Sequence, residues 1–112
     1  MKNCLIHKSL FFHDGNIVSL TWTGVKKTFK CKLTLDLYEN LDSANRTRKV
    51  LIFRKLRHMV FNGDFAKIAL NYSAGSIEDG GVEEFDGYQK LTIQLTGGEL
   101  VIEGLLDIQI EI

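Results

Sequence analysis

The chain has 112 residues, of which 45% are hydrophobic and 25% are charged, with 14 basic and 14 acidic side chains. This length fits one domain around one core, so we expect residues 1–112 to form a single β-rich domain. The composition is ordinary for a globular protein and argues against a disordered or fibrous chain, and no apolar run approaches the ~18 residues of a membrane-spanning helix.

The first residues, Met1 to Lys8, do not resemble a signal peptide, because their apolar stretch is short and no small-residue cleavage site follows. We therefore expect a cytoplasmic protein without a membrane partner. The two cysteines, Cys4 and Cys31, match no zinc or redox spacing. Cys31 falls on the apolar side of a strand pattern, where a thiol behaves as a small hydrophobic group, so we expect it to be structural.

The run Phe11-Phe12-His13-Asp14-Gly15 places a histidine beside an aspartate, which could form an acid–base pair. Neighbouring residues of a strand, however, point to opposite faces and cannot easily orient one another. We favour a polar turn that opens the first hairpin. In such a turn the Asp14 carboxylate would accept backbone N–H groups and His13 would pack against aromatic rings.

Two alternating segments follow, at residues 17–23 and 28–38, and Gly24 to Lys27 provides a turn between them. The odd positions from Phe29 to Leu37 are all apolar, and strict alternation over this length predicts a half-buried strand. Together the segments predict a β-hairpin. Trp22 lies on the apolar alternation, so we expect it in the core.

Residues 49–54 predict a further strand, covered on both faces at its centre, and residues 64–72 predict one short helix. Asp64 can cap this helix, whose apolar side chains share one face. Residues 91–95 and 100–102 alternate on either side of Gly97-Gly98, which predicts a tight hairpin. Gly104 is expected to interrupt the chain before a last strand at residues 106–112.

These elements predict a mainly β fold, namely an antiparallel β-sandwich or a strongly curved sheet of six or seven strands with one short helix. The spacing of His7, His13 and His58 lacks the close pairs that zinc sites use. The chain also has no glycine-rich phosphate loop and no recognisable nucleophile motif. We therefore expect a binding protein with no catalytic residues, metal or cofactor.

Charge is distributed unevenly along the chain. Residues 1–67 contain 13 basic and 5 acidic side chains, a net charge of +8, whereas residues 68–112 contain 1 basic and 9 acidic side chains, a net charge of −8. The basic stretch 46–57 could touch phosphates. The acidic segment 76–87 has no basic residue. Either the two halves neutralise each other through cross-strand pairs, or the acidic segment is a loop presented to a basic partner.

Three segments of the chain resemble a known family: Phe12-His13-Asp14 before an alternating strand, the central Leu51-Ile52-Phe53, and the pattern of residues 91–95 before Gly97-Gly98. Together they resemble small β-rich immunity proteins of bacterial polymorphic-toxin systems, including contact-dependent growth inhibition. The resemblance implies a cytosolic inhibitor without catalytic residues. It would bind a cognate toxin domain, often a nuclease with a basic cleft, and occlude the toxin's active site.

On this hypothesis the acidic segment binds the partner, its carboxylates taking the place of substrate phosphates and an aromatic residue serving as central anchor. The predicted partner-binding residues are Glu78, Asp79, Glu83, Glu84, Phe85, Asp86 and Tyr88. The partner would be a basic protein rather than nucleic acid, and the chain itself a monomer or weak dimer. Two alternatives stay open: a nucleic-acid-binding or regulatory module that uses residues 46–57, and a small-molecule or carbohydrate module that uses Trp22 and the tyrosines.

Overall fold

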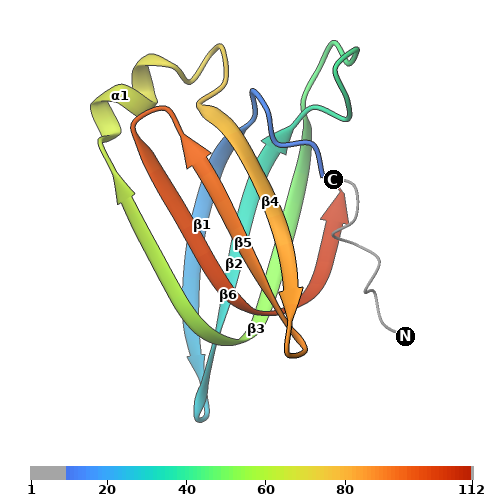
Figure 1. Cartoon of the computed structure of the whole chain (residues 1–112), viewed down its shortest axis with the longest axis vertical. Coiled ribbons are helices and arrows are strands. Elements are labelled where there is room, and N and C mark those ends of the chain that lie inside the picture. The colour runs from blue at the N-terminus through green and yellow to red at the C-terminus, as the bar shows by residue number, and fades with distance from the viewer. Residues whose placement is uncertain (1–9, 112) are drawn as a thin grey trace.

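The computed structural model describes residues 10–111, which form one antiparallel sheet of six strands in the order β1-β2-β3-β6-β5-β4 (Figure 1). The predictions made for the N-terminal segment, Cys4, His7 and Ile112 lie outside the described residues. The elements are β1 Asn16–Val25, β2 Thr28–Leu37, β3 Thr47–Gly63, α1 Phe65–Leu70, β4 Ile77–Phe85, β5 Tyr88–Leu95 and β6 Gly98–Glu111.

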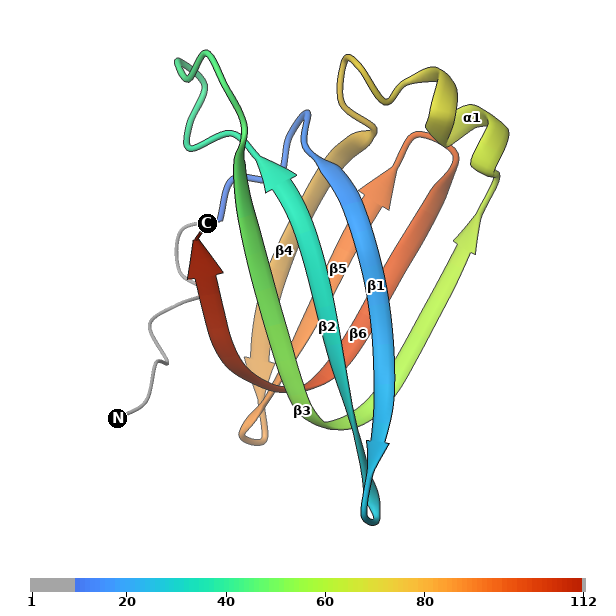
Figure 2. The same ribbon diagram turned by 180° about the vertical axis from the view of Figure 1, so that it is seen from behind.

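The two central strands, β3 and β6, bend sharply, and their bend folds the sheet into two facing layers (Figure 2). The register between them shifts between Arg54 and His58, where Lys55 has a positive φ of 49°. Before the bend β3 lies between β2 and β6. Beyond it, β3 pairs with β6 alone among the described strands. The predicted mainly β fold is confirmed, in the form of one strongly curved, open sheet.

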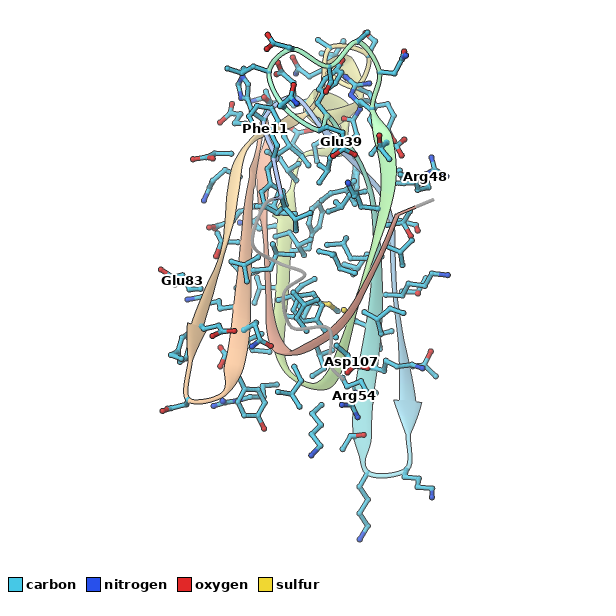
Figure 3. All side chains as sticks on the ribbon, turned by 90° about the vertical axis from the view of Figure 1, so that its right-hand side faces the viewer. Phe11, Glu39, Arg48, Arg54, Glu83 and Asp107 are labelled. Atoms are coloured by element: carbon cyan, nitrogen blue, oxygen red, sulfur yellow. The ribbon has the colours of Figure 1, made fainter. Side chains whose placement is uncertain are left out.

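The core lies between the two layers, where Figure 3 shows side chains meeting from both sides. Its almost fully buried members come from strands β2 to β6: Cys31, Leu33, Leu35, Leu37, Leu51, Phe53, Ile77, Leu91, Ile93, Leu100 and Ile102. Burial raises the pKa of the Cys31 thiol to about 11, so the thiol stays protonated at neutral pH. Cys31 is thus a structural residue, as predicted.

Both predicted hairpins are present, and Gly97 turns the second one with a φ of 101°. In the first hairpin Gly24 belongs to the strand, so the turn is shorter than predicted. The helix is also shorter than predicted. Asp64 caps it as expected, because its carboxylate accepts hydrogen bonds from the Ala66 and Lys67 backbone N–H groups at 3.0 and 3.3 Å.

Three expectations about elements are wrong. The strand predicted at residues 49–54 runs over 47–63, and β6 continues through Gly104. The acidic segment 76–87, expected as a loop, is mainly strand β4 and its turn to β5. Acidic residues and glycine are rare in strands, but pairing with β5 along the whole length of β4 outweighs that local preference.

Trp22 is not a core residue, since 60% of its side chain is exposed. Its register partner on β2 is the buried Cys31, so both residues lie on the inner face of the curved sheet. β3 stops pairing with β2 at Phe53, the register partner of Cys31, so Trp22 lies at the level where β3 turns away from β2. No helix in the described part of the chain is long and apolar enough to cross a membrane.

Candidate functional site: an acidic edge strand

Strand β4 forms one edge of the sheet and pairs with β5 alone among the described strands. Of the residues before β1, Asp14 and Gly15 bond to the beginning of β4: the Asp14 N–H donates to the Ile77 carbonyl at 2.8 Å, and the Ile77 N–H donates to the Gly15 carbonyl at 2.9 Å. An edge strand of this kind carries backbone groups that can pair with a strand of another chain.

The register with β5 assigns the side chains of β4 to two faces. Asp79, Glu83 and Phe85 lie on the outer face, opposite Gln94, Lys90 and Tyr88. Val82 lies on the inner face, opposite the buried Leu91. The predicted acidic residues therefore do not form a single flat surface, because alternate side chains of a strand point in opposite directions.

The predicted partner-binding residues fall into two groups along the strand. Glu78 and Asp79 lie at its beginning, next to the His13 turn, whereas the others surround the hairpin that joins β4 to β5. About 26 Å of extended strand separates Glu78 from Asp86, at roughly 3.3 Å per residue. We call the second group the acidic hairpin; it consists of Glu83, Glu84, Phe85, Asp86 and Tyr88.

At the beginning of β4, His13 contacts two partners. Its Nδ1 donates to the Glu78 carbonyl at 3.0 Å, and its Nε2 lies 3.5 Å from the Asp14 carboxylate. The hydrogen bond to Glu78, followed by the charge of Asp14, raises the pKa of His13. The expected turn is present, closed by the Gly15 N–H donating to the Phe12 carbonyl at 3.0 Å.

His13 and Asp14 were expected not to orient one another easily, yet their side chains lie 3.5 Å apart, and the reason given for that expectation is wrong. It assumed a strand, whereas the two residues lie in a turn in which Asp14 adopts a positive φ of 66°. The Asp14 carboxylate was expected to accept hydrogen bonds from backbone N–H groups, but it lies against the His13 side chain. The rings of His13 and Phe11 are nearly perpendicular, with centroids 6.5 Å apart, so His13 packs against one aromatic ring among the described residues.

Three carboxylates of β4 accept hydrogen bonds from neutral groups. Glu78 accepts a hydrogen bond from the Thr96 hydroxyl at 3.0 Å, and Asp79 accepts one from the Gly80 N–H at 2.8 Å. Glu84 accepts one from the Gln89 side chain at 3.2 Å. Among the ion pairs within residues 10–111, none joins Glu78, Asp79, Glu83 or Asp86 to a lysine or arginine.

The outward direction of Glu83 is visible in Figure 3, where its side chain points away from both layers. Lys90 lies directly opposite Glu83 in the β4–β5 register, but the two side chains form no ion pair. Lys90 is the only basic residue after position 67. The acidic hairpin therefore keeps a net negative charge.

The basic stretch 46–57 differs, because its arginines are held by partners within the protein. Arg46 donates to the Asp14 carbonyl at 3.0 Å, and its guanidinium lies 5.0 Å from the centre of the Tyr38 ring. Arg48 donates two hydrogen bonds to the Asp36 carboxylate, at 2.8 and 3.0 Å. These bonds hold the pKa of Asp36 below its ordinary value.

The same is true further along the stretch. Lys49, only 6% exposed, pairs with Glu39 at 3.0 Å, and Arg54 pairs with Asp107 at 3.0 Å (Figure 3). Arg57 lies 3.5 Å from the Glu103 carboxylate and 4.4 Å from the centre of the Tyr88 ring. The carboxylates that pair with the basic stretch are thus Asp36, Glu39, Glu103 and Asp107, none of which lies on β4.

The two candidate aromatic anchors have different surroundings. Tyr88 is half-buried beneath the Arg57 guanidinium, whereas Phe85 is 43% exposed at the end of β4. Of the two, Phe85 is therefore the residue whose ring can enter a pocket on a partner. A side chain that fills a pocket near the centre of an interface contributes a large share of the binding energy.

Sequence reasoning missed a pocket on the other side of the molecule, which Trp22 lines together with residues of β3, α1, β5 and β6. The signal in the sequence was the unusual concentration of large apolar residues in the second half of β3 and in α1, but no local pattern places these residues beside β1. Within residues 10–111, no group of three or more histidine, cysteine or acidic residues is arranged to hold a metal ion.

Comparison with protein-family models, curated proteins and solved structures found no match to this chain.

Proposed function

We propose that the chain is an immunity-type inhibitor that binds a basic toxin domain through strand β4 and the acidic hairpin, and so occludes the toxin's active site. The observation that carries the proposal is the difference between the two charged regions. In the basic stretch each arginine has a partner in the fold: Arg48, Arg54 and Arg57 pair with Asp36, Asp107 and Glu103, and Arg46 donates to the Asp14 carbonyl. The carboxylates of Glu83 and Asp86 have no such ion pair among the described residues.

Carboxylates such as those of Glu83 and Asp86, which form no ion pair with a described residue, are suited to an oppositely charged surface. Complementary charge speeds diffusional encounter and disfavours partners of the wrong sign. The edge position of β4 adds backbone groups that a partner strand could pair with, and Phe85 adds exposed apolar surface. These features support binding to a protein over binding to nucleic acid, whose phosphates the acidic hairpin would repel.

The test is reversal of two charges, Glu83→Lys with Asp86→Lys, in cells that produce a toxin domain against which the unmodified chain protects. The expected result is loss of protection and a dissociation constant raised at least about 30-fold, because breaking close charge pairs costs roughly 2 kcal/mol or more. The control is Asp42→Lys with Glu99→Lys, which changes the net charge by the same amount at exposed acids outside β4. This control is expected to protect normally.

Equal protection by both double variants would contradict the proposal. A titration of the unmodified chain with labelled duplex and single-stranded DNA distinguishes the alternative function. We expect no binding at low salt, since the arginines of residues 46–57 are already held by carboxylates, carbonyls and rings. Binding that weakens steeply with salt would support the nucleic-acid alternative instead.

A further inference from the structure

A pocket of about 390 Å³ opens between edge strand β1 and the second half of β3. Its walls come from five elements and the loop before β4, so residues far apart in the sequence meet there. In Figure 2, β1 stands in front of this region, α1 lies above it, and β5 and β6 lie behind. The lining residues are Ile17, Val18, Ser19, Leu20, Trp22, Phe61, Phe65, Ile68, Ser76, Leu95 and Leu100.

The lining is apolar and uncharged. Apart from Ser19 and Ser76, every lining side chain is aliphatic or aromatic, and none is acidic or basic. An ionised group brought into such a site would lose its hydration without gaining an ionic partner. The lining therefore selects an uncharged ligand with a mostly apolar body.

Large aromatic side chains at the pocket are left exposed. Trp22 is 60% exposed and Phe65 is 70% exposed, and the Phe65 ring lies 5.4 Å from that of Phe61. Exposed apolar surface beside a concave site is typical of a binding region, because a ligand there removes both surfaces from water. This pocket is lined by none of the residues of the acidic hairpin.

One polar group lies in the inner wall. Ser76 is 1% exposed, and its hydroxyl donates to the Asn16 side-chain oxygen at 2.7 Å, an oxygen that also accepts the Ser76 N–H at 2.8 Å. The Asn16 amide in turn donates to the Tyr72 carbonyl at 2.7 Å. Because its hydrogen is already used, the Ser76 hydroxyl is an acceptor for a donor on a ligand.

We propose that this pocket binds an uncharged, mostly apolar small molecule that carries one hydroxyl group, with the hydroxyl donating to Ser76. Its volume is more than twice that of the cavity of about 150 Å³ that accommodates one benzene molecule. The ligand is therefore the size of a medium-length alkyl alcohol or of two fused aromatic rings.

The test titrates the full chain with 1-decanol, followed by the fluorescence of Trp22, which is the only tryptophan. Isothermal titration calorimetry provides a second measurement that does not depend on Trp22. The expected result is saturable binding of one molecule per chain. Decanoate, which has a similar chain but is ionised at pH 7.5, is expected to bind at least tenfold more weakly.

Two variants of α1 test the location. Phe65→Ala removes a lining ring and is expected to weaken 1-decanol binding at least tenfold. Leu70→Ala changes a residue of the same helix that is 83% exposed and does not line the pocket, and it should bind as the unmodified chain does. Circular dichroism checks that both variants are folded.

Three outcomes would overturn the proposal: no saturable binding by either method, equal weakening by the two variants, or equal affinity for decanol and decanoate. None of these outcomes bears on the acidic hairpin, whose test uses other residues and another partner. The two proposals can therefore fail separately.

Discussion

Two adjacent glycines of β4 have different surroundings. A β carbon added to Gly80 would lie 2.7 Å from the Cγ atom of Phe12, a buried ring that packs against the inner face of the strand. A β carbon added to Gly81 would meet no atom within 4 Å. The Phe12 ring thus leaves no room for a side chain at position 80, whereas position 81 has room for one.

We expect Gly80→Ala to lower the free energy of unfolding by about 1–3 kcal/mol, because the Phe12 ring would have to move. Gly81→Ala should leave this free energy unchanged or raise it slightly, since alanine loses less conformational freedom on folding than glycine. Urea denaturation of the two variants, followed by circular dichroism, measures both effects. Equal destabilisation by the two changes would show that Phe12 is not the reason.

The burial of a single residue could be predicted from the sequence where it depends only on the strand to which the residue belongs. Cys31 was expected to be buried because it lies on a strictly alternating face, and it is. Trp22 lies on the same kind of pattern, but its exposure depends on where β3 turns away, some thirty residues later in the chain. Alternation assigns a side chain to a face of the sheet and does not show whether another element covers that face.

The bend of β3 and β6 depends on a second close approach. A β carbon added to Gly104 would lie 3.1 Å from the Arg54 carbonyl oxygen and 3.2 Å from the Leu56 Cα. Both are backbone atoms of the bulged part of β3, which cannot move without changing the register. Because Gly104 has no side chain, the backbone of β6 can lie close to the bulged backbone of β3 at the bend.

We expect Gly104→Val to lower the free energy of unfolding by about 1 kcal/mol or more, because its branched side chain would press on the backbone of β3. Strand propensity alone predicts the opposite sign, since valine favours strands and glycine does not. Gly81→Val is the matched control, in open space on β4, and should not destabilise. Stabilisation by both changes would mean that propensity outweighs packing at the bend. Thermal denaturation of both variants gives the comparison.

The same bend explains which elements the sequence did not reveal. Residues 49–54 have the apolar pattern of a strand, but the bulged residues after them break the alternation, so the second half of β3 could not be predicted. The acidic segment could not be predicted as a strand because its residue types disfavour one, and its pairing with β5 decides its structure. The sequence thus indicated the charge of the candidate site, but not that its residues form an edge strand and a hairpin.

The whole molecule is joined through one pair of strands that are distant in the sequence. Consecutive strands pair with each other on both sides, β1 to β3 and β4 to β6, but the two sets meet only where β3 pairs with β6. Because β3 and β6 both continue across the bend, each layer contains strands of both sets, and neither set can bury its inner apolar face alone. The sequence predicted a mainly β fold but not this order, since no local signal specifies which distant strands pair.

This architecture predicts that the two layers unfold together. In hydrogen exchange, the amides of Leu51 and Phe53 in β3 and those of Leu100 and Ile102 in β6 should be protected by the same free energy, that of global unfolding. Amides at the outer edge of β4 should exchange through local opening at a lower free energy, because β4 has a partner strand on one side only among the described strands. Exchange measured by nuclear magnetic resonance at several low urea concentrations separates local from global opening. If the β1–β3 and β4–β6 sets instead showed two distinct free energies, the pairing of β3 with β6 would not be what couples them. Each set would then hold its inner apolar residues without the other.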